Sequence, residues 1–246
     1  KQLRLKGKSF LRLESQWSIN DQNFEMILAV DDQRKIQTVN GKDIPSRTDH
    51  IGRFPIVIIC PEDENIIREG SLIRRKTFDH ILSLISKEYL MALIQYSRLL
   101  KQRNAYLKSN GPSRSEKEIL LTYSQQMQEP ARIISSTRTR ITKNIDQIFN
   151  KVYHEIGIEK EICTIDYQST CTNQNLLDIH KLELEKDLIT SRTNTGIHKD
   201  DWIFKLNDER VKYFGSQGQQ KTFVLSVKLS LAIIYIQSTG TIPLLL

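Results

Sequence analysis

The stretch Gly215-Ser216-Gln217-Gly218-Gln219-Gln220-Lys221 stands directly before an apolar helical run, and it decides how the rest of the chain is interpreted. Ser216 and Gln219 have the S-x-x-Q spacing of a capping box, which predicts a helix that begins near Gln217. Glycines on either side of the serine allow a tight turn and a close approach by another group. Free N–H groups and the positive helix end would then form a site for a phosphate. The alternative is a capped core helix without a ligand, because capping boxes are common helix starts.

The composition indicates a core of ordinary size and a basic surface. The chain has 246 residues, of which 39% are hydrophobic and 26% charged, and its formal net charge is +7. This balance favours an anionic partner such as nucleic acid or nucleotide. The three cysteines are too few and too scattered for a disulfide framework or a CxxC metal site, which favours a reducing cytoplasm. We expect no membrane-spanning segment and no signal peptide. Because the chain starts at Lys1 and stops inside an apolar run, we expect that both ends are truncated.

Residues 1–60 are expected to form short strands. Residues 24–30 and 35–39 predict a hairpin, and Asn40-Gly41 a turn after it. The continuous apolar run at 55–60 predicts a buried strand. Pro61 and the acids that follow predict a helix start, and Gly70-Ser71 should end that helix and begin another.

The second of these helices carries a basic cluster in its first turn. Arg74, Arg75 and Lys76 have the wrong sign for the positive end of a helix dipole. The cluster either pairs with nearby acids, for which Glu64 and Glu69 are candidates, or faces an anion. In the second case these three cations are candidate contacts to DNA or phosphate.

Two long helices joined by a short turn at 109–113 are predicted in the middle of the chain. The first covers residues 87–108, and its heptad a and d positions hold Leu90, Leu93, Ser97, Leu100, Asn104 and Leu107. The second covers residues 115–156 with a kink at Pro130. Its apolar stripe consists of Ile134, Ile141, Ile145, Ile148 and Val152. The pair should form an antiparallel arm.

After the arm the pattern becomes mixed again. Residues 162–167 predict a strand and residues 175–188 an amphipathic helix. Residues 202–206 and 211–214 predict a hairpin around Asn207-Asp208. The helix that begins near Gln217 should be buried, and a short apolar strand should follow from Pro243.

A second candidate site is the block Arg192-Thr193-Asn194-Thr195-Gly196-Ile197-His198-Lys199-Asp200-Asp201. His198 with Asp200 and Asp201 could be metal ligands or an acid–base pair, or the block could be a hydrogen-bonded structural loop. No further His or Cys stands nearby at ligand spacing, so we expect no metal site. The 246 residues contain no G-x-x-x-x-G-K-[ST] loop, so we expect no complete nucleotide-hydrolysing site and no ATP hydrolysis by this chain.

Four segments in order resemble the RecF family of bacterial DNA replication and repair proteins. The matching segments are Pro61-Glu62-Asp63 through Gly70-Ser71 to Phe78-Asp79; Tyr96 with Gln102-Arg103-Asn104-Ala105 and Leu107-Lys108; Arg192-Thr193, Gly196, His198 and Asp200-Asp201; and residues 215–222. The departures are Ile197, Lys199 and Ser191, where the family commonly has proline, arginine and glycine.

The resemblance implies an α/β fold, namely an ABC-ATPase-like head interrupted by a helical antiparallel arm. Residues 1–60 and 158–246 would be two parts of the head, and residues 61–157 the arm. In such heads ATP is held between two protomers, so Ser216, Gly218 and Gln219 would contact the ATP of the opposite subunit. Arg192, His198, Asp200 and Asp201 would lie beside the site. The ATP- and Mg²⁺-binding loops of this weak ATPase would lie outside residues 1–246, which would hold no catalytic residue.

The resemblance also implies partners. The family is expected to bind DNA at junctions of single and double strands, to dimerise with ATP, and to help load RecA together with RecR and RecO. It implies action in the cytoplasm during DNA damage and the SOS response. One alternative is a non-catalytic interaction module. Another SMC-like ABC head is disfavoured because the arm is too short for a long coiled coil.

Overall fold

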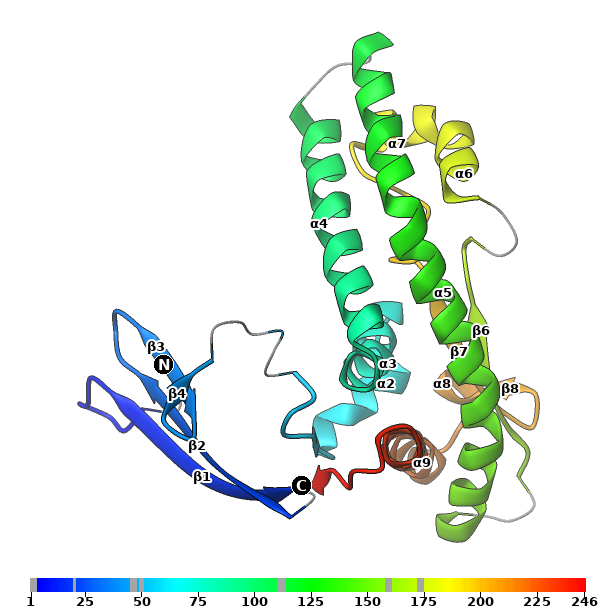
Figure 1. Ribbon diagram of the computed structural model, residues 1–246. Helices are drawn as coiled ribbons and strands as arrows, with labels where there is room; N and C mark the ends of the chain where they lie inside the picture. Colours follow the sequence, from blue (N-terminus) through cyan, green and yellow to red (C-terminus); the bar gives the residue numbers. More distant parts are fainter. Residues whose placement is uncertain are drawn as a thin grey trace.

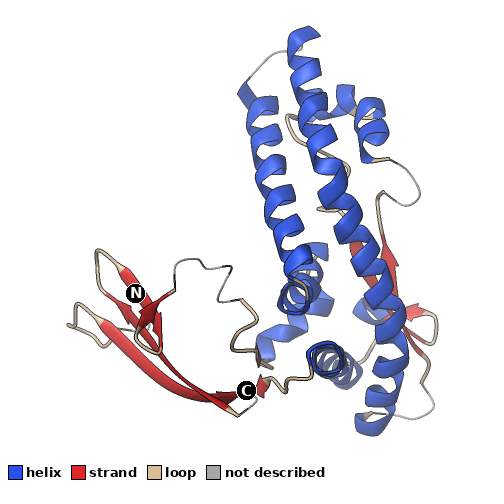
Figure 2. Ribbon diagram, in the orientation of Figure 1, coloured by secondary structure: helices blue, strands red, loops and turns tan. Residues whose placement is uncertain are grey.

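The fold consists of an antiparallel sheet at one side, an upright helical arm, and a base at which the C-terminus lies (Figures 1 and 2). The computed structural model describes residues 4–19, 21–44, 48, 51–109, 114–157, 161–171 and 175–246. The largest core cluster lies between the arm helices, the strands behind them and the helix at the base.

The antiparallel sheet has the strand order β1-β2-β3-β4. Its strands are β1 (Leu11–Ile19), β2 (Gln22–Val30), β3 (Lys35–Val39) and β4 (Lys42–Asp43). The predicted hairpin is confirmed, since β2 pairs with β3. Asn40 and Gly41, with φ of 49° and 72°, form the two-residue turn before β4, a left-handed conformation that these residue types accept best.

The prediction of a continuous buried strand over residues 55–60 is wrong. Only β5 (Ile56–Val57) is a strand, and it pairs in parallel with β9 (Leu244–Leu245). Ile58 is 54% exposed, and the chain bends at Cys60 into a helical turn. Backbone pairing continues past β5, since the Ile59 N–H donates to the Leu246 carbonyl at 2.7 Å, so the prediction fails in the burial of this segment more than in its pairing. The predicted strand after Pro243 is confirmed.

The central region is helical. Its elements are η1 (Pro61–Glu64), α2 (Asn65–Arg68), α3 (Ser71–Ile85), α4 (Lys87–Ser109) and α5 (Arg114–Ile156). The predicted helix boundary at Gly70-Ser71 is confirmed. The long helices α4 and α5 pack side by side as the predicted arm (Figure 1). Residues 110–113 of the predicted turn lie outside the described residues, and Pro130 lies inside α5.

The predicted heptad positions of α4 are confirmed at Leu90 and Leu107, but the register between them is wrong by one residue. The buried face is formed by Tyr89, Leu90, Ala92, Tyr96, Leu99, Arg103 and Leu107, whereas Ser97 is exposed. The sequence pattern missed this face because two of its members, Tyr96 and Arg103, carry polar tips that find buried partners. The apolar stripe of α5 is confirmed at Ile134, Ile141, Ile145 and Val152, and Ile148 is half-buried.

The last third of the chain returns to the base. Its elements are β6 (Cys163–Gln168), α6 (Leu176–Leu182), α7 (Leu184–Thr190), β7 (Asp201–Leu206), β8 (Glu209–Arg210), α8 (Val211–Phe214) and α9 (Gln217–Thr239). The single helix predicted at 175–188 is two helices that meet at Glu183. A hairpin around Asn207-Asp208 exists, but its second strand is β8, and the prediction of a strand at 211–214 is wrong. Residues 211–214 form a helical turn instead, because Val211 turns inward and is fully buried.

The expectation that no segment is apolar enough to cross a membrane is wrong for α9. This helix of 23 residues has the length and mean hydropathy of a membrane span. Half of its most apolar window is buried inside the protein, and the helix packs against α3 and α5. Phe223 and Val227 have no exposed surface, so the apolar composition of α9 belongs to the core.

Candidate functional site

The first turn of α9 has the capping box that the sequence predicts. Ser216 is the N-cap, and its Oγ accepts a hydrogen bond from the backbone N–H of Gln219 at 3.2 Å. The Oε1 of Gln219 in turn accepts from the backbone N–H of Ser216 at 2.7 Å. The two bonds fix the turn on both sides.

The turn leaves hydrogen-bond donors facing outward. The N–H groups of Gln217 and Gly218 begin the helix and have no intrahelical acceptor. The Ser216 hydroxyl accepts from Gln219, so its own hydrogen remains free to donate. A Cβ placed on Gly218 would meet nothing closer than the Ser216 Oγ at 4.0 Å, so the helix start is open to a close approach. Donors at the start of a long helix suit an anion.

The glycine before the serine has a different reason. Gly215 has an ordinary φ of −72°, but a Cβ there would lie 2.8 Å from the carbonyl oxygen of Val211. Its own N–H donates to that same oxygen at 3.0 Å. Gly215 therefore lets α8 end directly against the start of α9, and it is needed for space rather than for an unusual dihedral angle.

Gln219 is held from behind by a buried carboxylate. Its Nε2 donates to Glu161 Oε1 at 2.5 Å, and Tyr153 from the end of α5 donates its hydroxyl to Glu161 Oε2 at 2.5 Å. Burial raises the pKa of Tyr153, and the bond to Glu161 adds to the shift. Both ends of the Gln219 amide are thus used within the protein, which gives it a positioning role in this structure. A direct contact from Gln219 to ATP stays a prediction.

Sequence reasoning missed Glu161 and Tyr153 because neither stands in a motif. Tyr153 lines a cavity of about 350 Å³, and Glu161 supports its wall through Gln219. The residues that line this cavity are Tyr153, Gly157, Ser216, Gly218, Gln219 and Thr222. In the sequence, only the end of the α5 apolar stripe beside Gly157 indicated that this part of the chain packs against another element. The pairing with Gln219 joins residues 58 positions apart.

The basic cluster of α3 pairs within the protein, but not with the acids proposed for it. Arg74 makes a bidentate ion pair with Asp201, at 2.7 and 2.9 Å, and donates to two backbone carbonyls. Arg75 donates to the carbonyl oxygen of Asp200 at 2.5 Å. Glu64 pairs with Arg68 instead. Arg74 is buried with its donors taken up, so we no longer expect it at a phosphate, whereas contacts by Arg75 and the exposed Lys76 stay predictions.

Asp200 is the centre of a buried hydrogen-bond network at the base of the arm. Its Oδ2 accepts from Arg138 of α5 at 3.1 Å and from the Tyr167 hydroxyl, and its Oδ1 accepts from the Thr170 N–H at 2.8 Å. Arg138 also pairs with Asp79 of α3 at 2.8 Å. The network joins α3, α5 and β6 to the start of β7.

The histidine of the block is part of the same structural framework. His198 Nε2 donates to the Thr193 carbonyl at 3.1 Å, and Nδ1 accepts from the Tyr96 hydroxyl at 3.0 Å. Burial lowers the pKa of His198 to about 4. The buried His180 also donates to the block, at the Thr195 carbonyl, and burial lowers its pKa to about 4. Both rings are therefore neutral at pH 7, and both nitrogens of His198 are occupied.

These contacts favour the hydrogen-bonded structural loop among the interpretations of the block. The described residues contain no group of three His, Cys, Asp or Glu side chains that could hold a metal ion. Arg192 is exposed. The structure brings the α3 cluster and the block together through Arg74 and Asp201. In the described part of the chain no hydrogen bond joins the block to the Ser216 turn.

The comparisons with known proteins agree on one family. No family model matches the chain. It is 35% identical over 241 residues to the DNA replication and repair protein RecF of Cytophaga hutchinsonii, covering 98% of this chain and 64% of that protein. It is 34% identical over 242 residues to RecF of Flavobacterium johnsoniae, covering 98% of this chain and 67% of that protein. The chain thus spans about two thirds of the length of these relatives.

Two solved structures share the fold. One is the recombination mediator protein RecF with ATP in the RecFOR pathway, with a TM-score of 0.89, 26% identity, and coverage of 99% of this chain and 68% of that one. The other is RecF-ATPrS in the same pathway, with a TM-score of 0.88, 26% identity, and coverage of 97% and 67%. The α/β fold with its ABC-ATPase head and antiparallel arm is thereby shown. The chain belongs to the RecF family of DNA replication and repair proteins.

Proposed function

We propose that the chain works in DNA replication and recombinational repair as the part of an ATP-dependent DNA-binding protein that clasps ATP held by a second copy. It would bind gapped DNA at junctions of single and double strands. With RecR and RecO it would help load RecA, in the cytoplasm and during the SOS response to DNA damage. The family relation supports the process. The residues of this chain support the contact with ATP held by the second copy, which we call the nucleotide step.

One observation carries the nucleotide step: the open start of α9. Ser216, with the N–H groups of Gln217 and Gly218, offers three donors at the positive end of a helix. The open space over Gly218 would admit a terminal phosphate. ATP with Mg²⁺, held on the partner, would supply the negative charge that joins the two protomers. The residues present fit such a phosphate.

The domain boundaries are also a proposal. Residues 1–60 and 158–246 would form one head, and residues 61–157 would be an arm inserted into it. The parallel pairing of β5 with β9 supports this division, because it joins the first segment to the last.

The nucleotide step can be tested by mixing this chain with the full-length RecF of Cytophaga hutchinsonii, with and without ATP, and measuring association by sedimentation velocity. We expect ATP-dependent association with the unmodified chain and at least a roughly tenfold loss with Ser216→Arg, because the long cation fills the phosphate position. The matched control is Ser238→Arg, an exposed serine at the other end of α9. Association of the same strength without ATP, or with Ser216→Arg, would contradict the proposal.

A further inference from the structure

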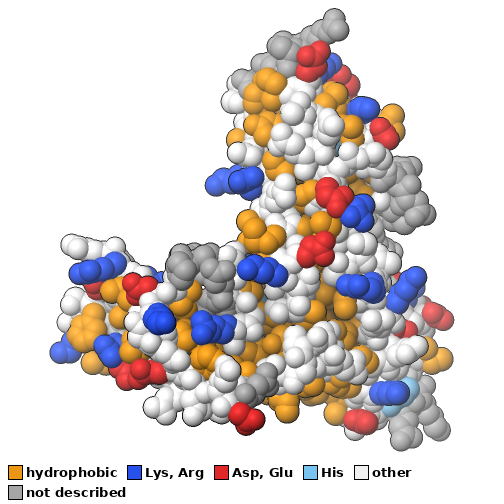
Figure 3. Space-filling view, viewed as in Figure 1, with side chains coloured by type: hydrophobic (Ala, Val, Ile, Leu, Met, Phe, Trp, Pro, Cys, Tyr) orange, Lys and Arg blue, Asp and Glu red, His pale blue; other side chains and the backbone are white. Residues whose placement is uncertain are grey.

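Between residues 140 and 151 the exposed face of α5 has no negative charge, and the exposed Glu155 follows one turn later. From residue 140 to residue 151 its exposed side chains are Arg140, Lys143, Asn144, Gln147 and Lys151. We call the three cations, Arg140, Lys143 and Lys151, the basic stripe. They follow one another at helical spacing on the outer side of α5, and Figure 3 shows Lys and Arg side chains over this part of the molecule.

The basic stripe is not neutralised from within. None of its three cations has an ion-pair partner among the residues that the structure describes. Of the carboxylates nearby, Asp166 pairs with Lys205 at 3.0 Å, Asp146 accepts from the backbone N–H of Ile165 at 3.4 Å, and the exposed Glu155 makes no ion pair with Lys151. A row of like charges repels itself, so an uncompensated row is favoured where an anion binds.

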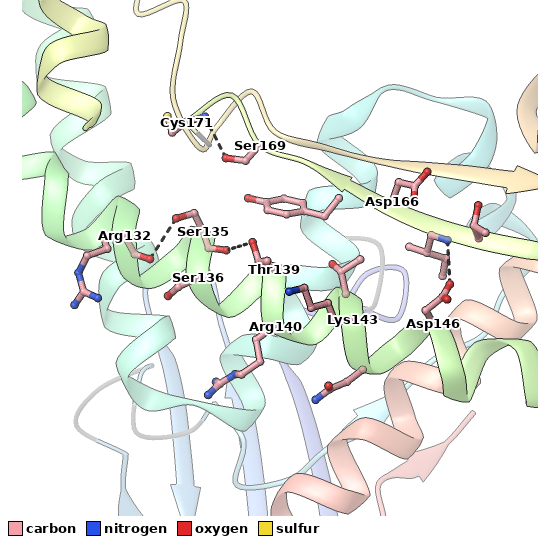
Figure 4. A pocket seen from close by; sticks show the side chains of 15 residues that line it. Arg132, Ser135, Ser136, Thr139, Arg140, Lys143, Asp146, Asp166, Ser169 and Cys171 are labelled. Carbon is pink, nitrogen blue, oxygen red and sulfur yellow. Dashed lines mark hydrogen bonds between the residues drawn. The ribbon is translucent and has the colours of Figure 1, made fainter. Parts of the chain in front are cut away.

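A hollow lies beside the basic stripe. It is a cavity of about 970 Å³ between α5 and β6, and Arg140 and Lys143 line it (Figure 4). Much of the remaining lining is short and polar, as at Ser135, Thr139 and Ser169, and the carboxylates of Asp146 and Asp166 also line the hollow. Because these hydroxyl side chains are short, they leave space for an extended polar chain to reach Arg140 and Lys143.

The dimensions distinguish an extended anion from a small one. Arg140 and Lys151 are 11 residues apart, which is about 16 Å along a helix. One DNA strand carries about five phosphates over that length of duplex axis. The cations stand in a row rather than converging on one point, so they match a repeating backbone better than a single phosphate ion.

We propose that the basic stripe binds the sugar–phosphate backbone of DNA. This inference rests on the proposed function, and it adds a DNA contact on α5 to those predicted for Arg75 and Lys76 of α3. The position also connects the two ligands. The stripe ends at Lys151, two residues before Tyr153, which holds the Glu161 carboxylate that in turn holds Gln219 of the nucleotide site.

The test is the salt dependence of binding to a 30-base-pair duplex, measured by fluorescence anisotropy between about 50 and 200 mM KCl. The variant is Arg140→Gln, Lys143→Gln and Lys151→Gln together, in the full chain. Counterion release predicts that it lowers the slope of log K against log [salt] by about 2.7, since each lost phosphate contact removes about 0.9. Because all three side chains are exposed, the thermal unfolding midpoint should not change.

The matched control removes three exposed cations from α4: Arg98→Gln, Lys101→Gln and Lys108→Gln. It should leave the slope unchanged. An unchanged slope in the α5 variant, or an equal drop in the α4 variant, would overturn the inference while the proposed function stands. If the α5 variant loses binding of a polyglutamate peptide while its DNA slope is unchanged, the partner is an acidic protein segment, and the inference is overturned. No DNA binding by the unmodified chain would contradict the proposed function itself.

Discussion

At the scale of single residues, the carboxylate of Glu161 decides whether the nucleotide turn keeps its shape. Glu161→Ala would leave the Tyr153 hydroxyl and the Gln219 amide without a partner, at a cost of about 1–3 kcal/mol in the free energy of unfolding. Glu161→Gln keeps the shape and an acceptor, so it should be closer to the unmodified chain. Urea unfolding measures the stability, and ATP-dependent association with full-length RecF measures the positioning role. If Glu161→Gln and Glu161→Ala associate equally well, Glu161 has no positioning role.

The residue scale also shows where sequence reasoning succeeds. The Ser216–Gln219 capping box was predictable because both partners lie within one turn of helix. Glu161 and Arg138 were not, because their partners are brought from distant segments by the packing of α5. Arg74 shows the same limit: its pairing was foreseen, but its partner, Asp201, lies 127 positions away.

At the scale of elements, the backbone at the C-terminal end of α7 is strained, and a glycine there should relieve the strain. Ser191 caps this helix with φ 51° and ψ 34°, the left-handed conformation in which a Cβ is unfavourable. Ser191→Gly should therefore raise the free energy of unfolding by roughly 0.5–1 kcal/mol, measured as a shift of the urea midpoint. Ser86→Gly is the control. Ser86 caps α3 at φ −131° and its hydroxyl accepts from Tyr89, so this change should destabilise by a few tenths of a kcal/mol. A gain at both sites or at neither would argue against backbone strain.

Element types were more predictable than their extents. The long helices and the first hairpin follow from periodicity and turn residues. The register of α4 and the short length of β5 do not, because both depend on the partner across the interface.

At the scale of the whole molecule, the buried His180 and the half-buried His198 make stability depend on pH. His180 and His198 have pKa values of about 4 in the folded chain, below the ordinary value of 6.5. Between pH 6.5 and 4 the unfolded chain therefore binds more protons than the folded one. The free energy of unfolding is therefore highest above about pH 6.5. It falls as the pH is lowered toward 4, by up to roughly 3 kcal/mol for each ring. Urea unfolding at pH 7.5, 6 and 5 measures this, and a curve flat from pH 7.5 to 5 would show that neither ring is buried in its neutral form.

The anchorage of Arg138 has a mechanical consequence. This one side chain is held by Asp79 of α3, and by Asp200 and the carbonyl of Ile197 in the loop before β7. These bonds anchor α5 near its middle to α3 and to the loop before β7. The basic stripe and Tyr153 both lie on the turns of α5 below this anchorage, so the proposed DNA contact and the support of the nucleotide turn belong to one anchored length of helix.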